Sequence, residues 1–407
     1  MNRKGIAVLL MLVLFLAAGA FAADEPVTSS TKVKFYGKIK GDLSYDDSRT
    51  SAGQYVYTVD SEDNNFQTAA NEKTKPKDDG KFNATARETR LGFNFSGPKM
   101  GSADIGGKVE FDFYGGANNA NNKGNIVLRH AYITAIWAES HDKLLVGQSW
   151  DIISPLNPTT LNYTVLWKCG NLGYRRAQAS YFKDIEMGES TLDFGVGIFD
   201  NQGDSALTPV VGGWAAAPTL QGRVGYTFPT WAAKPTLVAI TGHVGEMSGD
   251  GTAQGQHERY TTSSVNLSVS MPTTDWLILK GEVVNGRALG QFLGGIGNSI
   301  DTTMAHEVSS TGYWLAGTLG PWNKVSVNVG GGLDNPNEND MTSPAAGGAT
   351  KTIQNQCIFG NILWKMNANL TFGLELSNWQ TTYMNSTRAK HTARANRIQA
   401  SAIYSFY

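Results

Sequence analysis

Charged side chains recur at every second position in segments whose alternate positions are apolar. In one such segment Lys108, Glu110 and Asp112 alternate with Val109 and Phe111. A period of two is typical of β-strands that have one polar and one apolar face. Charges gathered on the inner face of a closed sheet act on ions in the water beside them, so the chemistry that this pattern indicates is ion selection.

Fourteen charged residues share this pattern and are candidates for lining the inner face. The basic candidates are Lys38, Lys40, Arg90, Lys108, Arg223, Lys280, Lys324, Lys365 and Arg397. The acidic candidates are Asp42, Glu110, Asp112, Glu282 and Glu375. The inner face is therefore expected to be slightly basic.

A second group of charges lies in and beside residues 150–173, a long connection between two alternating segments. Asp151 begins this connection, Lys168 lies within it, and Arg175 and Arg176 follow it. We expect Lys168 and one of the two arginines to form the basic side of a constriction that favours anions. Only one of the adjacent arginines can face inward along a regular strand. The alternative is that these cations pair with loop carboxylates and give no net selectivity.

Cys169 and Cys357 are the only two cysteines. Cys169 lies on the connection 150–173, and Cys357 falls on the polar phase of its segment. In an oxidising compartment a disulfide between them would pin the connection to the opposite wall. Such a bond requires Cα atoms within about 7 Å of each other. Two separated thiols are the alternative.

The sequence has no motif typical of an enzyme or of a resident metal ion. Its six histidines have no metal-ligand spacing, and it contains neither a nucleophile elbow nor a Walker loop. We therefore expect no catalytic residue, no metal and no cofactor. The Asn-rich stretch 118–122 and the acidic stretch 334–340 are interpreted as solvated loops. A formal charge of -1 argues against a nucleic-acid partner bound through a general basic field.

The composition and the N-terminus indicate an exported protein. Charged residues make up 17% of the 407 residues, whereas soluble proteins usually have about 25%. Residues 1–22 combine Arg3 and Lys4, an apolar run and the small-x-small site Ala20-Phe21-Ala22, so we expect a cleaved signal peptide. Residues 23–407 then form one unit. No later segment reaches the roughly 18 uncharged apolar residues of a membrane-spanning helix.

Sixteen alternating segments follow the predicted cleavage site. They lie at 33–45, 86–96, 103–114, 126–137, 143–149, 174–184, 190–200, 218–228, 234–246, 259–272, 275–286, 309–319, 323–332, 354–366, 368–384 and 396–407. Long and short connections alternate between them along the whole chain. This pattern predicts an all-β fold, a transmembrane antiparallel up-and-down β-barrel of 16 strands with both ends on the side of the short connections.

Aromatic residues support a membrane location. Five tryptophans lie in or within three residues of the predicted short connections, namely Trp137, Trp231, Trp276, Trp322 and Trp364. Such a girdle is typical of a membrane interface. The last segment resembles the C-terminal signal of outer-membrane proteins, although Phe406 is in phase with the apolar face and the final Tyr407 is one step beyond. We expect a location in the bacterial outer membrane, in contact with its lipid.

The segment 126–137 is ambiguous in phase. Arg129 shares one face with Ile133 and Trp137, and His130 shares the other with Ile136. Two explanations remain open at this point. The strand lies at a contact between subunits, or it contains a β-bulge.

Three stretches resemble the DcaP-like porins, a family of bacterial trimeric porins. They are Leu128–Tyr132 (LRHAY), Val146–Asp151 (VGQSWD) and Asn157–Asn162 (NPTTLN), and the resemblance is strongest over residues 126–182. It implies a homotrimer in which the third long connection, here 150–173, folds into the lumen of the barrel and narrows the pore. It also implies a preference for organic anions such as dicarboxylates.

The function that we expect is a water-filled channel for the passive diffusion of small hydrophilic solutes and ions. Barrels of this strand number leave an aqueous lumen, and charged side chains at a constriction set ion preference. The alternatives are an outer-membrane barrel enzyme of the lipase or protease type and a secreted glycan-binding β protein. The secreted protein needs neither the aromatic-terminated strand nor the sixteen alternating connections.

Overall fold

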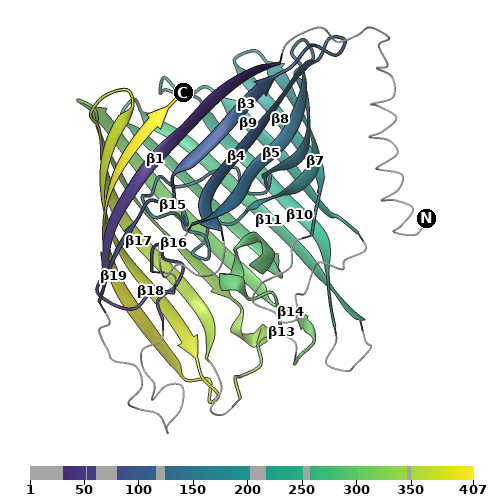
Figure 1. The fold of residues 1–407 in the computed structure, drawn as a ribbon. Helices are drawn as coiled ribbons and strands as arrows, with labels where there is room; N and C mark the ends of the chain where they lie inside the picture. Colours follow the sequence, from purple (N-terminus) through teal and green to yellow (C-terminus); the bar gives the residue numbers. More distant parts are fainter. Residues whose placement is uncertain are drawn as a thin grey trace.

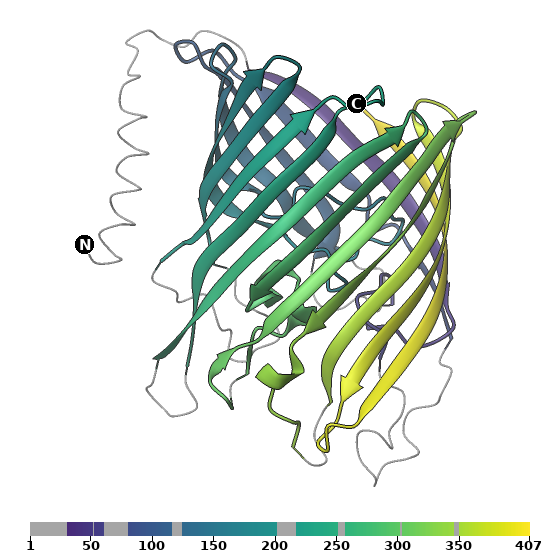
Figure 2. The ribbon, with the colours of Figure 1, turned by 180° about the vertical axis from the view of Figure 1, so that it is seen from behind.

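The computed structural model describes residues 31–51, 53–60, 80–115, 124–201, 217–250, 257–301, 303–345 and 350–407. They form one closed antiparallel barrel whose interior is crossed by chain segments (Figures 1 and 2). The predicted signal peptide and the stretch 118–122 lie outside the described residues. Within the described ranges, no helix has the length and apolar character needed to cross a membrane.

The wall strands follow one another around the barrel in chain order. They are β1 (Lys32–Asp46), β2 (Lys81–Thr85), β3 (Arg90–Ser96), β4 (Asp104–Gly115), β5 (Asn125–Trp137), β6 (Asp142–Trp150), β7 (Arg175–Met187), β8 (Ser190–Phe199), β9 (Thr219–Phe228), β10 (Thr236–Asp250), β11 (His257–Thr274), β12 (Leu277–Arg287), β15 (Ser309–Trp322), β16 (Val325–Pro336), β17 (Lys351–Lys365), β18 (Leu370–Met384) and β19 (Lys390–Phe406). β19 pairs with β1 from Gly37↔Phe406 to Asp46↔Arg397, which closes the barrel.

Two of these strands are parts of one barrel strand. β2 and β3 both pair with β1, and residues 86–89 interrupt the strand between them. Counted this way, the wall has the predicted sixteen strands. The expected strand at 86–96 instead begins at Lys81 and is broken in the middle.

The two faces of the wall are arranged as the alternation predicts. On β1, the outward Leu43 and Tyr45 are 53% and 48% exposed, whereas the inward Asp42 and Ser44 are buried. An apolar outer surface of this kind is stable in hydrocarbon. Trp231, Trp276, Trp322 and Trp364 are exposed beside the short connections, as expected for an aromatic girdle.

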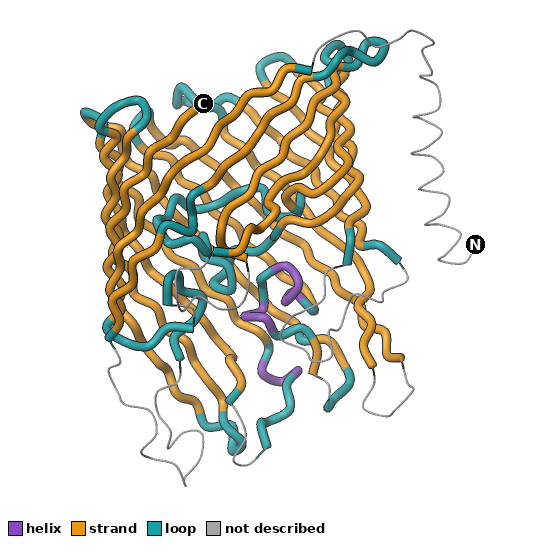
Figure 3. Tube along the Cα trace, viewed as in Figure 1, coloured by secondary structure: helices purple, strands orange, loops and turns teal. Residues whose placement is uncertain are grey.

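Three long connections fold into the barrel interior (Figure 3). The first inward segment comprises the described residues of 47–60, and the inward loop comprises residues 151–174. The second inward segment comprises the described residues of 288–308 and contains the short helices η2 (Leu289–Phe292) and η3 (Gly295–Gly297) and the strand pair β13 (Ile300–Asp301) and β14 (His306–Glu307). A further short helix, η4 (Glu338–Asp340), follows β16. The inward position of the third long connection was predicted, but those of the other two were not.

Apolar clusters hold these segments against the inner wall. Val56 and Val59 of the first inward segment and Leu166 of the inward loop pack against Trp314 and Trp379 of the wall. In a second cluster, Ile153 and Leu172 of the inward loop pack against residues of η2 and β12. The core of the protein therefore lies inside the barrel.

Candidate functional site

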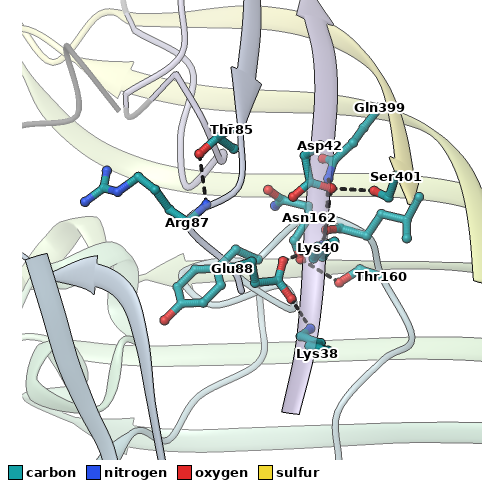
Figure 4. Close-up of polar contacts among 12 residues, drawn as sticks. Lys38, Lys40, Asp42, Thr85, Arg87, Glu88, Thr160, Asn162, Gln399 and Ser401 are labelled. Atoms are coloured by element: carbon teal, nitrogen blue, oxygen red, sulfur yellow. Dashed lines mark hydrogen bonds and ion pairs between the residues drawn. The ribbon is translucent and has the colours of Figure 1, made fainter. Parts of the chain in front are cut away.

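The interruption between β2 and β3 places Glu88 in a charged contact inside the barrel (Figure 4). Its carboxylate forms ion pairs with Lys38, at 2.5 Å between Nζ and Oε1, and with Lys40, both on β1. The sequence prediction missed Glu88. It lies two residues before Arg90 and therefore on the same phase, so the alternation that identified Arg90 also points to Glu88.

Arg87 holds the interruption in place. Its guanidinium donates hydrogen bonds to the carbonyls of Phe113 (2.9 Å) and Gly115 (3.1 Å) and to the side chain of Gln54 (3.2 Å). Its backbone N–H donates to Thr85 Oγ1 at 3.2 Å (Figure 4). These bonds satisfy polar groups that a continuous strand would pair with its neighbours, and Glu88 is thereby fixed beside the two lysines.

Glu110 is the centre of a second charged contact on the same wall. It accepts hydrogen bonds from Tyr36 (2.8 Å) and from Arg129 Nε (2.8 Å). Arg90 and Lys108 lie farther away, each at 3.5 Å. Five cations against four carboxylates line this wall: Lys38, Lys40, Arg90, Lys108 and Arg129 against Asp42, Glu88, Glu110 and Asp112.

A β-bulge explains the ambiguous phase of the segment 126–137. The register between β4 and β5 shifts between Glu110 and Phe111, so that Arg129 and His130 both face the interior. Arg129 then also reaches Asp112 at 2.7 Å. Arg129 was not among the predicted pore residues because a period of two cannot place a residue at a bulge.

Three cations of this wall remain partly exposed, whereas the carboxylates around them do not. The side chains of Lys38, Arg90 and Lys108 are 23%, 26% and 25% exposed, and those of Glu88 and Glu110 are 10% and 6% exposed. Lys38 pairs directly with Arg90 in the β1–β3 register. We name these three side chains the basic wall.

Two predicted pore carboxylates anchor the inward loop instead of facing solvent. Glu375 on β18 accepts the backbone N–H groups of Leu161 (2.6 Å) and Asn162 (3.2 Å). Glu282 on β12 accepts from Ser154 Oγ (2.6 Å) and from the N–H of Leu156 (3.1 Å). Both carboxylates are almost completely buried.

Lysine and glutamine side chains hold the same part of the loop from the other wall. The carbonyl of Leu161 accepts from Lys40 Nζ (2.8 Å) and from Gln399 Nε2 (3.0 Å). Gln399 also donates to Asp42 (Figure 4). Lys40 and Asp42 are therefore buried supports of the loop rather than exposed lining residues.

The charges at the two ends of the inward loop are buried. Arg176 Nε lies 2.8 Å from Asp151 Oδ1, and its guanidinium donates to Gln291 and stacks on Phe292 of η2. Arg175 packs its guanidinium over the rings of Trp150 (4.6 Å) and Tyr174 (4.5 Å).

Of the four charges expected at the constriction, only Lys168 keeps partial exposure, beside the Tyr57 ring. Arg175 and Arg176 are 1% and 0% exposed, because the aromatic rings and the second inward segment cover them. Arg176 pairs with Asp151, a carboxylate of the inward loop. Such pairing is the alternative to a basic constriction that the sequence left open.

The other predicted lining residues are distributed around the wall. Arg223 forms an ion pair with Asp193 at 2.7 Å, and Lys280 is partly exposed. Lys324 and Lys365 are exposed near short connections. Arg397 is buried against Asp46 at 2.7 Å.

Cys169 and Cys357 are both free thiols in this structure, and both are buried in one apolar cluster. Cys169 Sγ lies 3.2 Å from the carbonyl of Gly332, the residue that pairs with Cys357 across β16 and β17. The inward loop thus meets the wall beside Cys357. The disulfide itself stays a prediction.

A serine, a histidine and a carboxylate lie near one another on the inner wall, at spacings wider than is usual for a nucleophile and its base. Ser149 Oγ is 3.4 Å from His130 Nδ1, and His130 Nε2 is 4.0 Å from Glu110. Activated nucleophiles usually lie within about 2.6–3.2 Å of their base. Glu110 is also engaged by Arg129 and Tyr36. Within the described residues, no group of three or more His, Cys, Asp or Glu side chains could hold a metal ion.

A closed sixteen-stranded antiparallel barrel with an apolar exterior and a long loop folded into its lumen defines an outer-membrane β-barrel of the porin type. Residues 13–187 match the family model described as DcaP outer membrane protein. This match includes the three stretches quoted from the sequence and confirms the resemblance to that family and the outer-membrane location. No curated protein matches the chain.

Solved structures show the same fold at low sequence identity. The outer membrane channel DcaP of Acinetobacter baumannii is 18% identical, with 94% of this chain and 100% of that chain covered and a TM-score of 0.69. An anion-selective porin from Comamonas acidovorans is 11% identical, with 93% and 100% covered and a TM-score of 0.57. OprB of Pseudomonas putida is 11% identical, with 92% and 94% covered and a TM-score of 0.55.

Proposed function

We propose that this protein is a homotrimeric porin that passes small hydrophilic solutes passively and prefers organic anions, dicarboxylates among them. The observation that carries the proposal is the basic wall. Lys38, Arg90 and Lys108 are the exposed charges of a group whose carboxylates are buried. A passing solute therefore meets positive charge on this wall.

Electrostatics supports an anion preference. Partly exposed charges in a passage attract the opposite ion and repel the like one. A unit charge about 4 Å from a passing ion changes the energy of that ion by about 1 kcal/mol in water and by more in a less polar medium. The three inward segments lie inside the barrel and narrow the passage, which favours small solutes.

Conductance in a planar bilayer under a salt gradient tests the proposal. We expect a reversal potential that shows anion preference, and block by added dicarboxylates. The variant K38Q/R90Q/K108Q should lower the anion-to-cation permeability ratio about fivefold, from about 1 kcal/mol of lost attraction. The control variant K324Q/K365Q removes two exposed lysines near the short connections and should change the ratio little. Cation preference of the unaltered protein would refute the proposal.

The oligomeric part of the proposal is supported by resemblance. One solved structure with this fold is described as the trimer form of OmpT, an outer membrane protein of Vibrio cholerae. We expect conductance to close in three equal steps and the native mass to be that of three chains. A single step and a single-chain mass would contradict the trimer and leave the channel proposal intact.

A further inference from the structure

A chain of amide side chains runs across the outer face of the wall, over β17, β18, β19 and β1. Gln356 donates to Gln380 (2.9 Å), Gln380 to Asn378 (2.9 Å), Asn378 to Asn396 (2.8 Å) and Asn396 to Asp47 (2.7 Å). All five side chains lie on the outward phase of their segments. The lumen contacts described above do not involve them.

This amide chain marks the border of the apolar belt. Directly toward the short connections, the outward residues are Ile358, Leu376, Ile398 and Tyr45, which are between 44% and 71% exposed. In outer-membrane barrels the long connections face the outside of the cell. The amide chain therefore lies where hydrocarbon gives way to the headgroups of the outer leaflet.

A groove of about 640 Å³ joins the two zones. Its apolar part is lined by Val329, Ile358, Leu376 and Ile398, and its polar rim by Asp47, Asn378 and Asn396, among others. A groove with an apolar floor and a polar rim fits an amphiphile lying along the wall. An entirely polar ligand would make no apolar contact with the floor of the groove, and an entirely apolar ligand would make no hydrogen bond with its rim.

The amides at the rim have hydrogen-bonding groups that a polar headgroup could satisfy. Each amide has two N–H donors and an oxygen with two lone pairs, and the amide chain uses one donor of each of its four amides. The four amides lie on the outward phase of their strands, and leaving their remaining polar groups unpaired in hydrocarbon is costly. Hydroxyl groups of a sugar can both accept from and donate to such amides.

Arg394 supplies a positive charge beside this rim. It pairs with Gln380 in the β18–β19 register, lies two residues from Asn396 and has an exposed side chain. Among the described residues, no hydrogen bond or ion pair of its guanidinium is recorded. A guanidinium in this position is suited to a phosphate group.

We propose that this groove binds one phosphorylated glycolipid of the outer leaflet, with acyl chains on the apolar floor, sugar hydroxyls on the amide chain and a phosphate on Arg394. The proposal rests on the membrane location of the barrel and does not depend on channel activity. A second copy of this chain seated on the same groove is the competing occupant.

Native mass spectrometry of the purified, folded protein with bisphosphorylated lipid A as the probe tests the proposal. We expect one lipid A to remain bound to each chain at low lipid excess. The variant R394Q should weaken this binding about tenfold, since a lost hydrogen bond to a charged group is worth about 1.4 kcal/mol or more. The variant N378A/N396A should weaken it by a similar factor, since it removes two hydrogen bonds to neutral hydroxyls. The difference in affinity between R394Q and the unaltered protein should be smaller for monophosphorylated lipid A than for bisphosphorylated lipid A.

Matched controls come from a part of the outer wall that does not line the groove. Asn285 donates to Thr311 at 2.8 Å on the outward face of β12 and β15, and Arg287 is exposed two residues farther on. N285A and R287Q should leave lipid A binding unchanged. Heat-modifiable migration and unchanged conductance show that each variant is folded.

Three results would overturn the proposal. Equal binding of lipid A by R394Q, N378A/N396A and the unaltered protein would show nonspecific annular lipid. If phosphatidylglycerol, which carries no sugar ring, displaced bound lipid A as effectively as free lipid A does, the sugar would have no role in binding. Loss of the oligomer in N378A/N396A with unchanged lipid A binding would assign the groove to a contact between copies.

Discussion

Asp151 and Arg176 tie the two ends of the inward loop together. The carboxylate of Asp151, at the start of the loop, lies 2.8 Å from Arg176 Nε, just beyond its end. The backbone reinforces this closure, because Asp151 N–H donates to the carbonyl of Tyr174 (2.7 Å) and Tyr174 N–H donates to Asp151 Oδ2 (2.8 Å). The base of the loop is therefore a closed ring of contacts.

Replacing Arg176 by Gln should destabilise the folded protein strongly. It leaves the Asp151 carboxylate buried without its cation, and breaking one partner of a buried pair costs about 3–5 kcal/mol. Urea unfolding in detergent, followed by heat-modifiable migration, measures the loss. The control R223Q breaks the partly exposed pair with Asp193 and should cost about 1 kcal/mol or less. Equal losses in the two variants would contradict the anchoring role.

Replacing Glu375 by Gln should loosen the inward loop and raise single-channel conductance. The carboxylate accepts two consecutive N–H groups of the loop, and a neutral amide oxygen accepts them more weakly, by about 1–3 kcal/mol for the pair. The matched control is E307Q, because Glu307 also accepts a backbone N–H, that of Thr261, but outside the inward loop. Unchanged conductance in both variants would argue against Glu375 as a loop anchor.

Cys169 and Cys357 should be bridged in protein taken from an oxidising periplasm. The inward loop brings Cys169 against the carbonyl of Gly332, beside Cys357, and this proximity in the folded protein favours the bond in an oxidising compartment. A bond across so long a segment would also stabilise the folded state. Mass spectrometry of non-reduced peptides checks this. Free thiols at both positions would exclude the bridge.

Cys169 should be unreactive as a free thiol. Burial raises its pKa well above the ordinary value, so the reactive thiolate is scarce at neutral pH. In the variant C357S, alkylation by iodoacetamide should be slow in the folded protein and fast after unfolding. Rapid alkylation of the folded variant would show that the loop leaves the wall readily.

The second inward segment should become less stable at low pH through Asp301. Burial alone would raise the pKa of this carboxyl, but hydrogen bonds from Lys351, the backbone of Met304 and Thr342 outweigh it and hold the pKa below its ordinary value. The stabilisation is therefore full above the unfolded pKa of about 3.9 and is lost as the pH falls toward the lowered folded value.

Limited proteolysis of residues 300–308 between pH 7 and pH 2, with an acid-stable protease at low pH, measures this loss. In D301N the segment should be cleaved at a rate that depends less on pH, since the titrating group is gone. A pH dependence in D301N equal to that of the unaltered protein would assign the effect to another group.

Local sequence patterns predicted the wall of the barrel well. A period of two sets which face each residue occupies, so the inward phase of Lys108 and the outward phase of Leu43 followed from the sequence alone. The same pattern could not reveal the break at 86–89 or the bulge at Arg129, because both depart from that period.

The contents of the lumen could not be predicted in the same way. Alternation shows that Glu375 faces inward, but not that its partners are the N–H groups of a loop more than 200 residues earlier in the chain. Nor does any local signal show that the residues around Phe292 cover Arg176. These contacts depend on which long connections meet inside the closed wall.

The anchoring of the inward loop has a consequence for the order of assembly. Leu161 is separated by 214 residues from Glu375 and by 238 from Gln399, and both contacts are made by strands near the C-terminal end. The loop follows β6, so its contacts with β18 and β19 can form only after the last of eleven further wall strands has been synthesised. Contacts over such sequence separations form slowly. The complete seating of the loop is therefore a late event, and a chain that lacks β18 and β19 cannot hold Leu161 in its final place.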